Sequence, residues 1–295
     1  MKKISVIGSG TMGNGIAHIF AQNNFQVSLI DISEEALVNA LKKISNNLNR
    51  LVKKEVISEE TKQKTISNIK TFTSIKEGVI NSDLAIEAAS ERLDLKIKIF
   101  QDLDLLCPKE TILATNTSSI SITKIAKATK RQDKVIGMHF MNPVPIMKLV
   151  EVIKGEKTSK KTTEEIMKLS EKLNKIPVEV NDAPGFVANR ILMPMINEAI
   201  LTLQQNVSGV IEIDTVMKLG MSHPMGPLHL ADFIGLDVCL SILEVMHEDF
   251  NEKKYEPCAL LKEMVKNKEL GVKSNIGFYD YSEGLKMKKL SKRFI

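Results

Sequence analysis

The stretch that decides the fold is ISVIGSGTMG, residues 4–13, followed by VSLID, residues 27–31. An apolar run leads into Gly8, Gly10 and Gly13, and the apolar residues after them recur with the spacing of one helix face. The next apolar run ends at Asp31, about twenty residues beyond the glycines. A GxGxxG motif between a strand and a helix, with an acidic residue at that spacing, is typical of a dinucleotide-binding site.

Each residue of the motif has a physical role in that interpretation. Gly8 permits the tight turn out of the strand, Gly10 lets the backbone approach a pyrophosphate, and Gly13 lets the helix lie close to the sheet. The helix N-terminus begins at Thr11 and Met12 and presents unpaired N–H groups to the phosphates. We therefore expect this whole turn to bind the cofactor.

The carboxylate of Asp31 predicts which dinucleotide is bound. It would accept hydrogen bonds from the ribose hydroxyls of NAD, and it would repel the 2′-phosphate of NADP. Neither Ile32 nor Ser33 supplies a cation to offset that repulsion, so NAD is favoured. The alternative is a glycine turn in an α/β protein, with Asp31 merely flanking a helix that Ser33 caps.

Composition limits the class of protein. The 295 residues allow two domains, and 43% hydrophobic with 26% charged residues is ordinary for a globular chain. The net charge of +5 is modest and partly lies in the tail at residues 286–293, so we expect no nucleic-acid partner. No apolar run is long enough for a membrane span, and the scattered histidines lack metal-ligand spacing. Three widely spaced cysteines without a CxxC pair favour a reduced, cytoplasmic location.

Strand-like and helical patterns alternate through the first part of the chain, which predicts a parallel, doubly wound α/β sheet over residues 1–183. The expected strands are residues 4–7, 27–30, 84–87, 111–115, 135–140, 148–153 and 176–180. From Pro184 the apolar residues keep helical spacing, so residues 184–295 are expected to form an all-helical domain. A helix over residues 231–246 is apolar on more than one face, which predicts a partner subunit.

Four polar residues are the catalytic candidates. Ser118 follows the strand at 111–115, and His139 lies near the end of the next apolar run. Glu151 follows a proline-containing turn, where two antiparallel strands could bring its carboxylate to the imidazole. Asn189 lies in the first helix of the second domain. Taken singly, each also has a structural explanation, such as a helix cap or a hydrogen-bonded strand histidine.

A long helical pattern over residues 36–56 carries a cluster of positive charge. Arg50 and Lys54 are one turn apart on one predicted face, beside Lys53. The ordinary interpretation of such a cluster is a solvated helix face. Spacing alone does not distinguish that from a binding surface.

Several stretches resemble the L-3-hydroxyacyl-CoA dehydrogenase family, and most closely its short bacterial branch. They are TNTSS at 115–119, GMHFMNPVP at 137–145, PGFVANR at 184–190, HPMGP at 223–227 and GFYDY at 277–281, in the family's order. The resemblance implies a Rossmann domain, a helical dimerisation domain, and a homodimer or higher oligomer. It also implies NAD-dependent oxidation of a short-chain L-3-hydroxyacyl-CoA, 3-hydroxybutanoyl-CoA, to its 3-oxo product.

The same resemblance assigns roles to individual residues. It implies that His139 is the general acid–base, Glu151 its partner, and Ser118 and Asn189 the residues that position the substrate. Further cofactor contacts fall on Glu91 and Lys96, and acyl-CoA contacts on Arg50 and Lys54. The chain departs from the pattern at Arg50, where lysine is common, at Met141, where an aromatic is common, and in its basic tail.

Two other classes of protein are compatible with parts of this pattern. A hydroxyacid or sugar-acid dehydrogenase of the lambda-crystallin-like branch would share the fold, but it would not need CoA-binding charge at Arg50 and Lys54. A non-catalytic NAD-binding protein would be expected to have lost His139 or Glu151. Both residues are present here.

Overall fold

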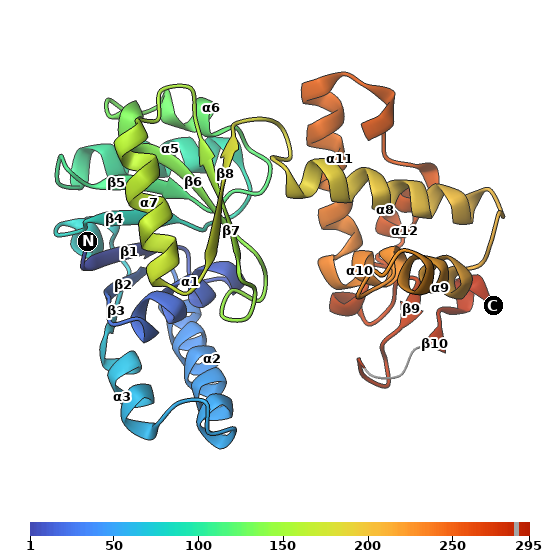
Figure 1. Ribbon diagram of the computed structural model, residues 1–295, viewed down its shortest axis with the longest axis horizontal. Helices are drawn as coiled ribbons and strands as arrows, with labels where there is room; N and C mark the ends of the chain where they lie inside the picture. The colour runs from blue at the N-terminus through green and yellow to red at the C-terminus, as the bar shows by residue number, and fades with distance from the viewer. Residues whose placement is uncertain (286–288) are drawn as a thin grey trace. The chain divides into compact units, whose positions relative to one another are not determined.

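The structure is a computed structural model that describes residues 1–285 and 289–295. The chain divides into two compact units, Met1–Ala183 and Pro184–Ile295 (Figure 1). Residues 286–288, part of the basic tail noted above, lie outside the described residues. Within the described ranges, no helix has the length and apolar character needed to cross a membrane.

The first unit is built on a mixed sheet with the order β3-β2-β1-β4-β5-β6-β7-β8. The strands are β1 (Lys3–Ile7), β2 (Gln26–Ile30), β3 (Ile69–Phe72), β4 (Leu84–Glu87), β5 (Ile112–Thr115), β6 (Val135–Phe140), β7 (Leu149–Lys154) and β8 (Ile176–Asn181). Strands β1 to β6 run parallel, β7 is antiparallel to β6, and β8 is parallel to β7. The carboxyl ends of β1 to β6 therefore lie at one end of the sheet, where α/β proteins bind their ligands.

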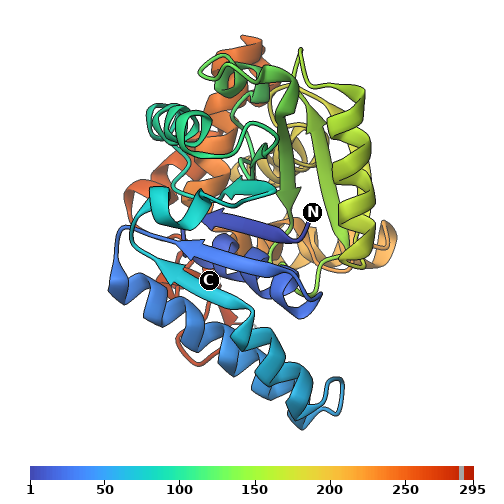
Figure 2. The same cartoon turned by 90° about the vertical axis from the view of Figure 1, so that its left-hand side faces the viewer.

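Helices lie on both faces of this sheet (Figure 2). They are α1 (Thr11–Gln22), α2 (Glu34–Lys53), α3 (Glu59–Ser67), α4 (Ile75–Val79), α5 (Leu93–Leu106), α6 (Ile122–Ala126), a 3-10 turn (Gln132–Lys134) and α7 (Lys160–Lys172). One core joins α1, α2 and α7 to one face of the strands, and α4, α5 and α6 contact the other. The central strands β4, β5 and β6 are buried on both faces, which explains their continuous apolar runs. This confirms the predicted α/β class.

Two details of the first unit differ from the sequence prediction. Strand β3 was not predicted, because its alternating sequence IKTF is polar on one face, as suits an edge strand. The helix predicted over residues 36–56 ends at Lys53. Glu55 has φ 57°, a left-handed conformation that cannot continue the helix.

The second unit is mainly helical. Its elements are α8 (Ala188–Gln204), α9 (Val210–Gly220), α10 (Pro227–Ile234), α11 (Leu236–Phe250), α12 (Ala259–Lys266), 3-10 turns at Lys253–Tyr255, Val272–Ser274 and Lys292–Phe294, and the strand pair β9 (Tyr279–Asp280) and β10 (Lys289–Leu290). The single helix predicted over residues 231–246 is wrong. Gly235, with φ 102°, separates α10 from α11.

Candidate active site

The glycine turn joins β1 to α1 in the geometry expected of a dinucleotide site. Gly8 has φ 98°, and a side chain at Gly13 would collide with the carbonyl oxygen of Gly8, so neither position accepts a side chain. A Cβ at Gly10 would meet only open space among the described residues. No described side chain caps α1, whose first N–H groups therefore remain available to a phosphate. Thr11 is exposed, whereas Met12 packs against the core.

Asp31 follows the end of β2 and binds back onto this turn. Its carboxylate accepts hydrogen bonds from the backbone N–H and hydroxyl of Ser9, both at 2.8 Å, and from the Ser33 N–H at 3.1 Å. Burial opposes ionisation, but these hydrogen bonds outweigh it and hold the pKa of Asp31 below its usual range. Asp31 is therefore a fixed anion beside the turn, which suits a ribose and disfavours a 2′-phosphate. Ser33 also caps α2, accepting from the Ala36 N–H at 3.2 Å.

His139 and Glu151 form a buried pair on neighbouring antiparallel strands. They are direct partners in the register of β6 and β7, so the backbone places their side chains on the same face. Glu151 Oε2 lies 2.7 Å from His139 Nδ1, with the two side chains 3% and 10% exposed. The proton of this hydrogen bond belongs on Nδ1, which leaves the lone pair of the neutral ring on Nε2. The two antiparallel strands thus bring the carboxylate to the imidazole, as the sequence suggested, and the catalytic role of the pair stays a prediction.

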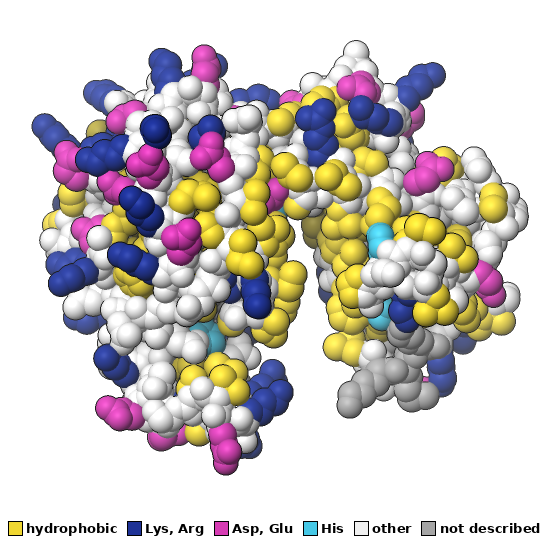
Figure 3. All heavy atoms as spheres, in the orientation of Figure 1, with side chains coloured by type: hydrophobic (Ala, Val, Ile, Leu, Met, Phe, Trp, Pro, Cys, Tyr) yellow, Lys and Arg dark blue, Asp and Glu magenta, His cyan; other side chains and the backbone are white. Residues whose placement is uncertain are grey.

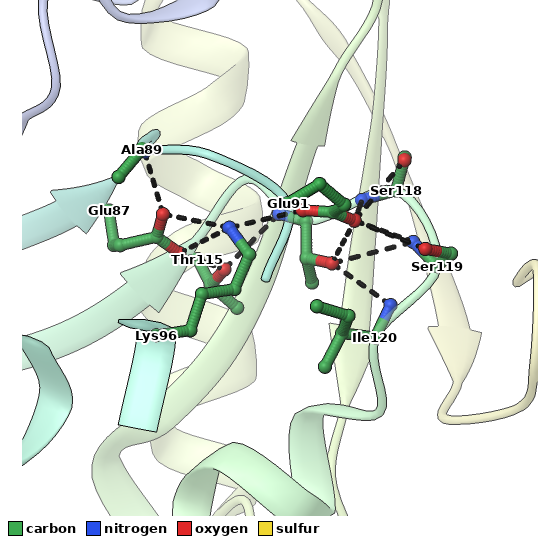
Figure 4. A network of polar contacts seen from close by, with 9 residues as sticks. Glu87, Ala89, Glu91, Lys96, Thr115, Ser118, Ser119 and Ile120 are labelled. Atoms are coloured by element: carbon green, nitrogen blue, oxygen red, sulfur yellow. Dashed lines mark hydrogen bonds and ion pairs between the residues drawn. The ribbon is translucent and has the colours of Figure 1, made fainter. Parts of the chain in front are cut away.

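Glu91 organises the loop that carries Ser118, just beyond β5 (Figure 4). Its Oε1 accepts from the Thr117 hydroxyl at 2.5 Å, from the Ser118 N–H at 2.9 Å and from the Ser119 N–H at 3.2 Å. Burial alone would raise the pKa of Glu91, but the Lys96 ammonium and these donors hold it below its usual range. The loop is thus built around an ionised carboxylate.

Lys96 connects Glu91 to a second carboxylate that the sequence analysis did not single out. Its amino group lies 2.8 and 2.9 Å from the two oxygens of Glu87 and 3.1 Å from Glu91 Oε2. Glu87 also accepts from the Thr115 hydroxyl at 2.7 Å and from the Ala89 N–H at 2.7 Å (Figure 4). Lys96 and Glu87 are fully buried, so this pair is a fixed support beneath the Ser118 loop. The available signal for Glu87 was a charged residue at the end of an otherwise apolar strand.

The structure separates the two basic residues that the family resemblance linked to acyl-CoA. Arg50 lines a cavity of about 330 Å³ that reaches from Thr11 at the start of α1 to residues 142–145 after β6. Lys43, two turns before Arg50 on the same face of α2, lines the same cavity and was not predicted. Lys54 lies just beyond the end of α2 and does not line it.

Asn189 belongs to the second unit. It lies in the first turn of α8, is 8% exposed, and its N–H donates to the Gly185 carbonyl at 3.1 Å. Its relation to Ser118 and His139, which belong to the first unit, stays a prediction.

Within the first unit, the candidate residues share a location at or just beyond the carboxyl ends of parallel strands. They are Gly8, Asp31, Glu91, Ser118 and His139.

Family models cover nearly all of the chain. The model for the NAD-binding domain of 3-hydroxyacyl-CoA dehydrogenase matches residues 3–183. The model for the C-terminal domain of 3-hydroxyacyl-CoA dehydrogenase matches residues 185–281.

Individual proteins match along the whole length as well. A probable 3-hydroxybutyryl-CoA dehydrogenase of Bacillus subtilis is 51% identical over 283 residues, covering 96% of this chain and 98% of its own. A 3-hydroxybutyryl-CoA dehydrogenase of Clostridioides difficile is 50% identical over 281 residues, covering 95% and 100% of the two chains. The crystal structure of (S)-3-hydroxybutyryl-CoA dehydrogenase from Ralstonia eutropha superposes with a TM-score of 0.92 at 46% identity, covering 96% and 99%.

Proposed function

The chain belongs to the 3-hydroxyacyl-CoA dehydrogenase family and is an NAD-dependent oxidoreductase, and from this premise we propose that it interconverts 3-hydroxybutanoyl-CoA and acetoacetyl-CoA. The relatives whose names give that substrate support this choice of acyl chain. They are 51% and 50% identical over 96% and 95% of this chain. The single observation that carries the chemistry is the buried contact of 2.7 Å between His139 and Glu151. It supplies a proton acceptor whose tautomer and orientation are already set.

His139 exchanges the proton of the reaction. During oxidation, Nε2 takes the proton from the substrate hydroxyl as the carbonyl double bond forms, and the carbon-bound hydrogen leaves as a hydride. In the reverse direction, the protonated ring returns that proton to the developing alkoxide. Glu151 keeps the ring oriented and stabilises the imidazolium, without taking the proton itself.

Ser118 and Asn189 hold the substrate oxygens for that transfer. The Ser118 loop is fixed from below by Glu91, and Glu91 is fixed by Lys96 and Glu87. A serine on such a loop is positioned before substrate binds, which reduces the entropy lost in reaching the reactive geometry. We assign Ser118 and Asn189 as hydrogen-bond donors to substrate and not as nucleophiles.

The described residues fit NAD as the cofactor. The open space at Gly10, the uncapped α1 N-terminus and the ionised Asp31 suit a pyrophosphate followed by an unphosphorylated ribose. Glu91 and Lys96 complete the cofactor side, although every donor of the Lys96 ammonium is directed at a carboxylate, so Lys96 acts on the cofactor through Glu91. When bound, NAD supplies the hydride acceptor.

We further propose that Arg50 and Lys54 contact the phosphate-bearing part of CoA. Arg50 is supported by the cavity that it shares with Thr11 and Lys43, because a cationic wall beside a helix N-terminus attracts a phosphate. Lys54 has weaker support, since it stands outside this cavity. Its contribution would be a longer-range attraction that salt screens.

The test of this function is a set of initial rates. We expect the protein to oxidise NADH with acetoacetyl-CoA, to use NADPH far less efficiently, and to leave free acetoacetate essentially unreduced. His139→Ala should lower kcat by about 10²–10⁴-fold while NADH binding persists, and Lys134→Met, a change outside the pair, should leave the rate unchanged. Equal rates with free acetoacetate would favour the lambda-crystallin-like alternative, and NADPH use matching NADH would refute the role of Asp31.

We also propose that the second unit forms a homodimer. Its surface exposes large apolar side chains on and around α8 and α9, including Ile191, Val207, Val216 and Leu219. Val207 and Val216 line an apolar groove of about 400 Å³, and Figure 3 shows hydrophobic side chains gathered over α9 and α10. Such a patch favours burial against a second copy. Light scattering at micromolar concentration should report a dimer, and Leu219→Lys with Val216→Lys should give a monomer; a monomeric, active parent protein would refute this.

We place the protein in the cytoplasm. Cys107, Cys239 and Cys258 are all free thiols. Free thiols are typical of a reducing compartment. Fractionation of cells that express the protein would test the assignment.

A further inference from the structure

The loop between β6 and β7, residues 141–148, connects the strand of His139 to the strand of Glu151. We call it the β6–β7 loop. Residues 142–145 of this loop form one wall of the cavity that Arg50 and Thr11 also line. What fixes this loop therefore fixes the shape of that wall.

Lys175, which comes later in the sequence, contacts this loop. It lies in the turn between α7 and β8 and is 6% exposed. Its ammonium donates to the carbonyl oxygens of Val144, at 2.5 Å, and Met147, at 2.7 Å. Among residues 1–285 and 289–295, no carboxylate forms an ion pair with it. A buried cation is tolerated only when such hydrogen bonds replace its water, so these two carbonyls are its essential partners.

The burial of Lys175 has a further consequence for its charge. Desolvation lowers the pKa of the amino group from its ordinary value. Hydrogen bonds from a charged donor are stronger than those between neutral groups, so the two carbonyls are held firmly while the group is protonated.

A second contact fixes the same part of the loop against α1. Val144 is 2% exposed, and a Cβ built on Gly15 would lie only 2.9 Å from the Val144 Cβ. The loop thus crosses α1 where that helix has no side chain. Lys175 holds the loop by the carbonyl groups of Val144 and Met147, and Gly15 leaves room for the side chain of Val144.

We propose that Lys175 is a positioning residue that locks the β6–β7 loop as a wall of the acyl-CoA cavity. The inference rests on the proposed function for the identity of the ligand. The His139–Glu151 pair is set separately, by the register of β6 and β7, and it does not depend on the loop. Loosening the loop should therefore weaken acyl-CoA binding more than it slows the chemical step.

The test replaces Lys175 with Met, which keeps the length of the side chain and removes its donors. We expect the KM for acetoacetyl-CoA to rise between about 10- and 100-fold, the effect of losing hydrogen bonds to a charged group. The kcat and the KM for NADH should change by less than about threefold. Lys175→Arg, which keeps a buried cation with donors, should recover part of the loss.

Lys134→Met is the matched control. Lys134 also donates to a backbone carbonyl, that of Lys109 at 3.0 Å, but it lies in the 3-10 turn before β6 and does not line the cavity. Its KM for acetoacetyl-CoA should equal that of the parent protein. A rise of the same size in this variant would assign the effect to general loss of stability and overturn the inference.

Hydrogen exchange keeps the inference separable from the proposed function. The Ile146 and Met147 amides donate to the Pro143 carbonyl within the loop, at 2.9 and 3.0 Å, and they should exchange faster in Lys175→Met. If the parent protein does not act on acetoacetyl-CoA, the proposed function fails, and faster exchange at these amides would still support the clamp. Unchanged exchange together with an unchanged KM overturns it. Should Lys175→Met not fold, Lys175→Gln, which retains one donor group, is measured in the same way.

Discussion

Replacing Glu151 with Gln is the change that tests the mechanism most directly. The side chain keeps its shape and loses its charge, so the effect measures what the carboxylate contributes to an imidazolium 2.7 Å away. Opposite charges whose centres are roughly 4 Å apart attract by about 4 kcal/mol at an effective dielectric constant of 20. That energy corresponds to about a thousandfold in rate. Because the amide recovers part of the hydrogen bond, we expect kcat to fall between about 10²- and 10³-fold.

The assay is a double-mutant cycle followed by NADH absorbance with saturating acetoacetyl-CoA. His139→Ala alone should lower kcat by about 10²–10⁴-fold, the range for a lost general acid–base. The double variant should be scarcely slower than His139→Ala, because groups that act together are strongly non-additive. Glu179→Gln, on the neighbouring strand β8 and half-exposed, is the control and should be within about twofold of the parent. If the two losses multiply, Glu151 does not act through His139 and the mechanism is wrong.

Three further changes test other parts of the molecule. Arg50→Ala with Lys54→Ala should raise the KM for acyl-CoA, with little change in kcat, and the effect should shrink as salt is added; unchanged kinetics would make both residues part of a solvated surface. Asp31→Ser with Ile32→Arg should shift the preference from NADH toward NADPH, since position 32 is 94% exposed and can present a cation; an unchanged preference would contradict the role of Asp31. Burial lowers the pKa of His18 to about 4 from 6.5, so the unfolded state takes up a proton first as the pH falls. Protonation of His18 should therefore lower the free energy of unfolding by about 3 kcal/mol between pH 6.5 and 4. Urea titrations of His18→Leu over the same pH range should lack this contribution.

The fold could be predicted from sequence where a local pattern determined the structure. The apolar strands buried on both faces and the glycine turn are of this kind, because each requires particular residues in a row. Strand β3 escaped prediction because an edge strand needs only one apolar face. The break between α10 and α11 had a visible signal in Gly235, but its positive φ is a consequence of the tertiary fold.

The candidate site divides in the same way. His139 and Glu151 were predicted as a pair because a short turn between two strands brings close positions into register. Glu87 and Lys175 were not, since each acts on residues that are distant in sequence: Glu87 through Thr115, and Lys175 through Val144. Sequence spacing carries no information about such contacts until the strand order is known.

The antiparallel pairing of β6 and β7 has a consequence for how this enzyme can diversify. A one-residue shift within β7 would turn Glu151 to the opposite face of the sheet and end its contact with His139. The residues of the connecting loop at 141–148 take no part in the paired register of β6 and β7. Substitutions between residues 141 and 148 can thus change the wall of the cavity that Arg50 lines and leave the contact between His139 and Glu151 in place. The wall of this cavity and the His139–Glu151 pair can therefore vary separately from each other.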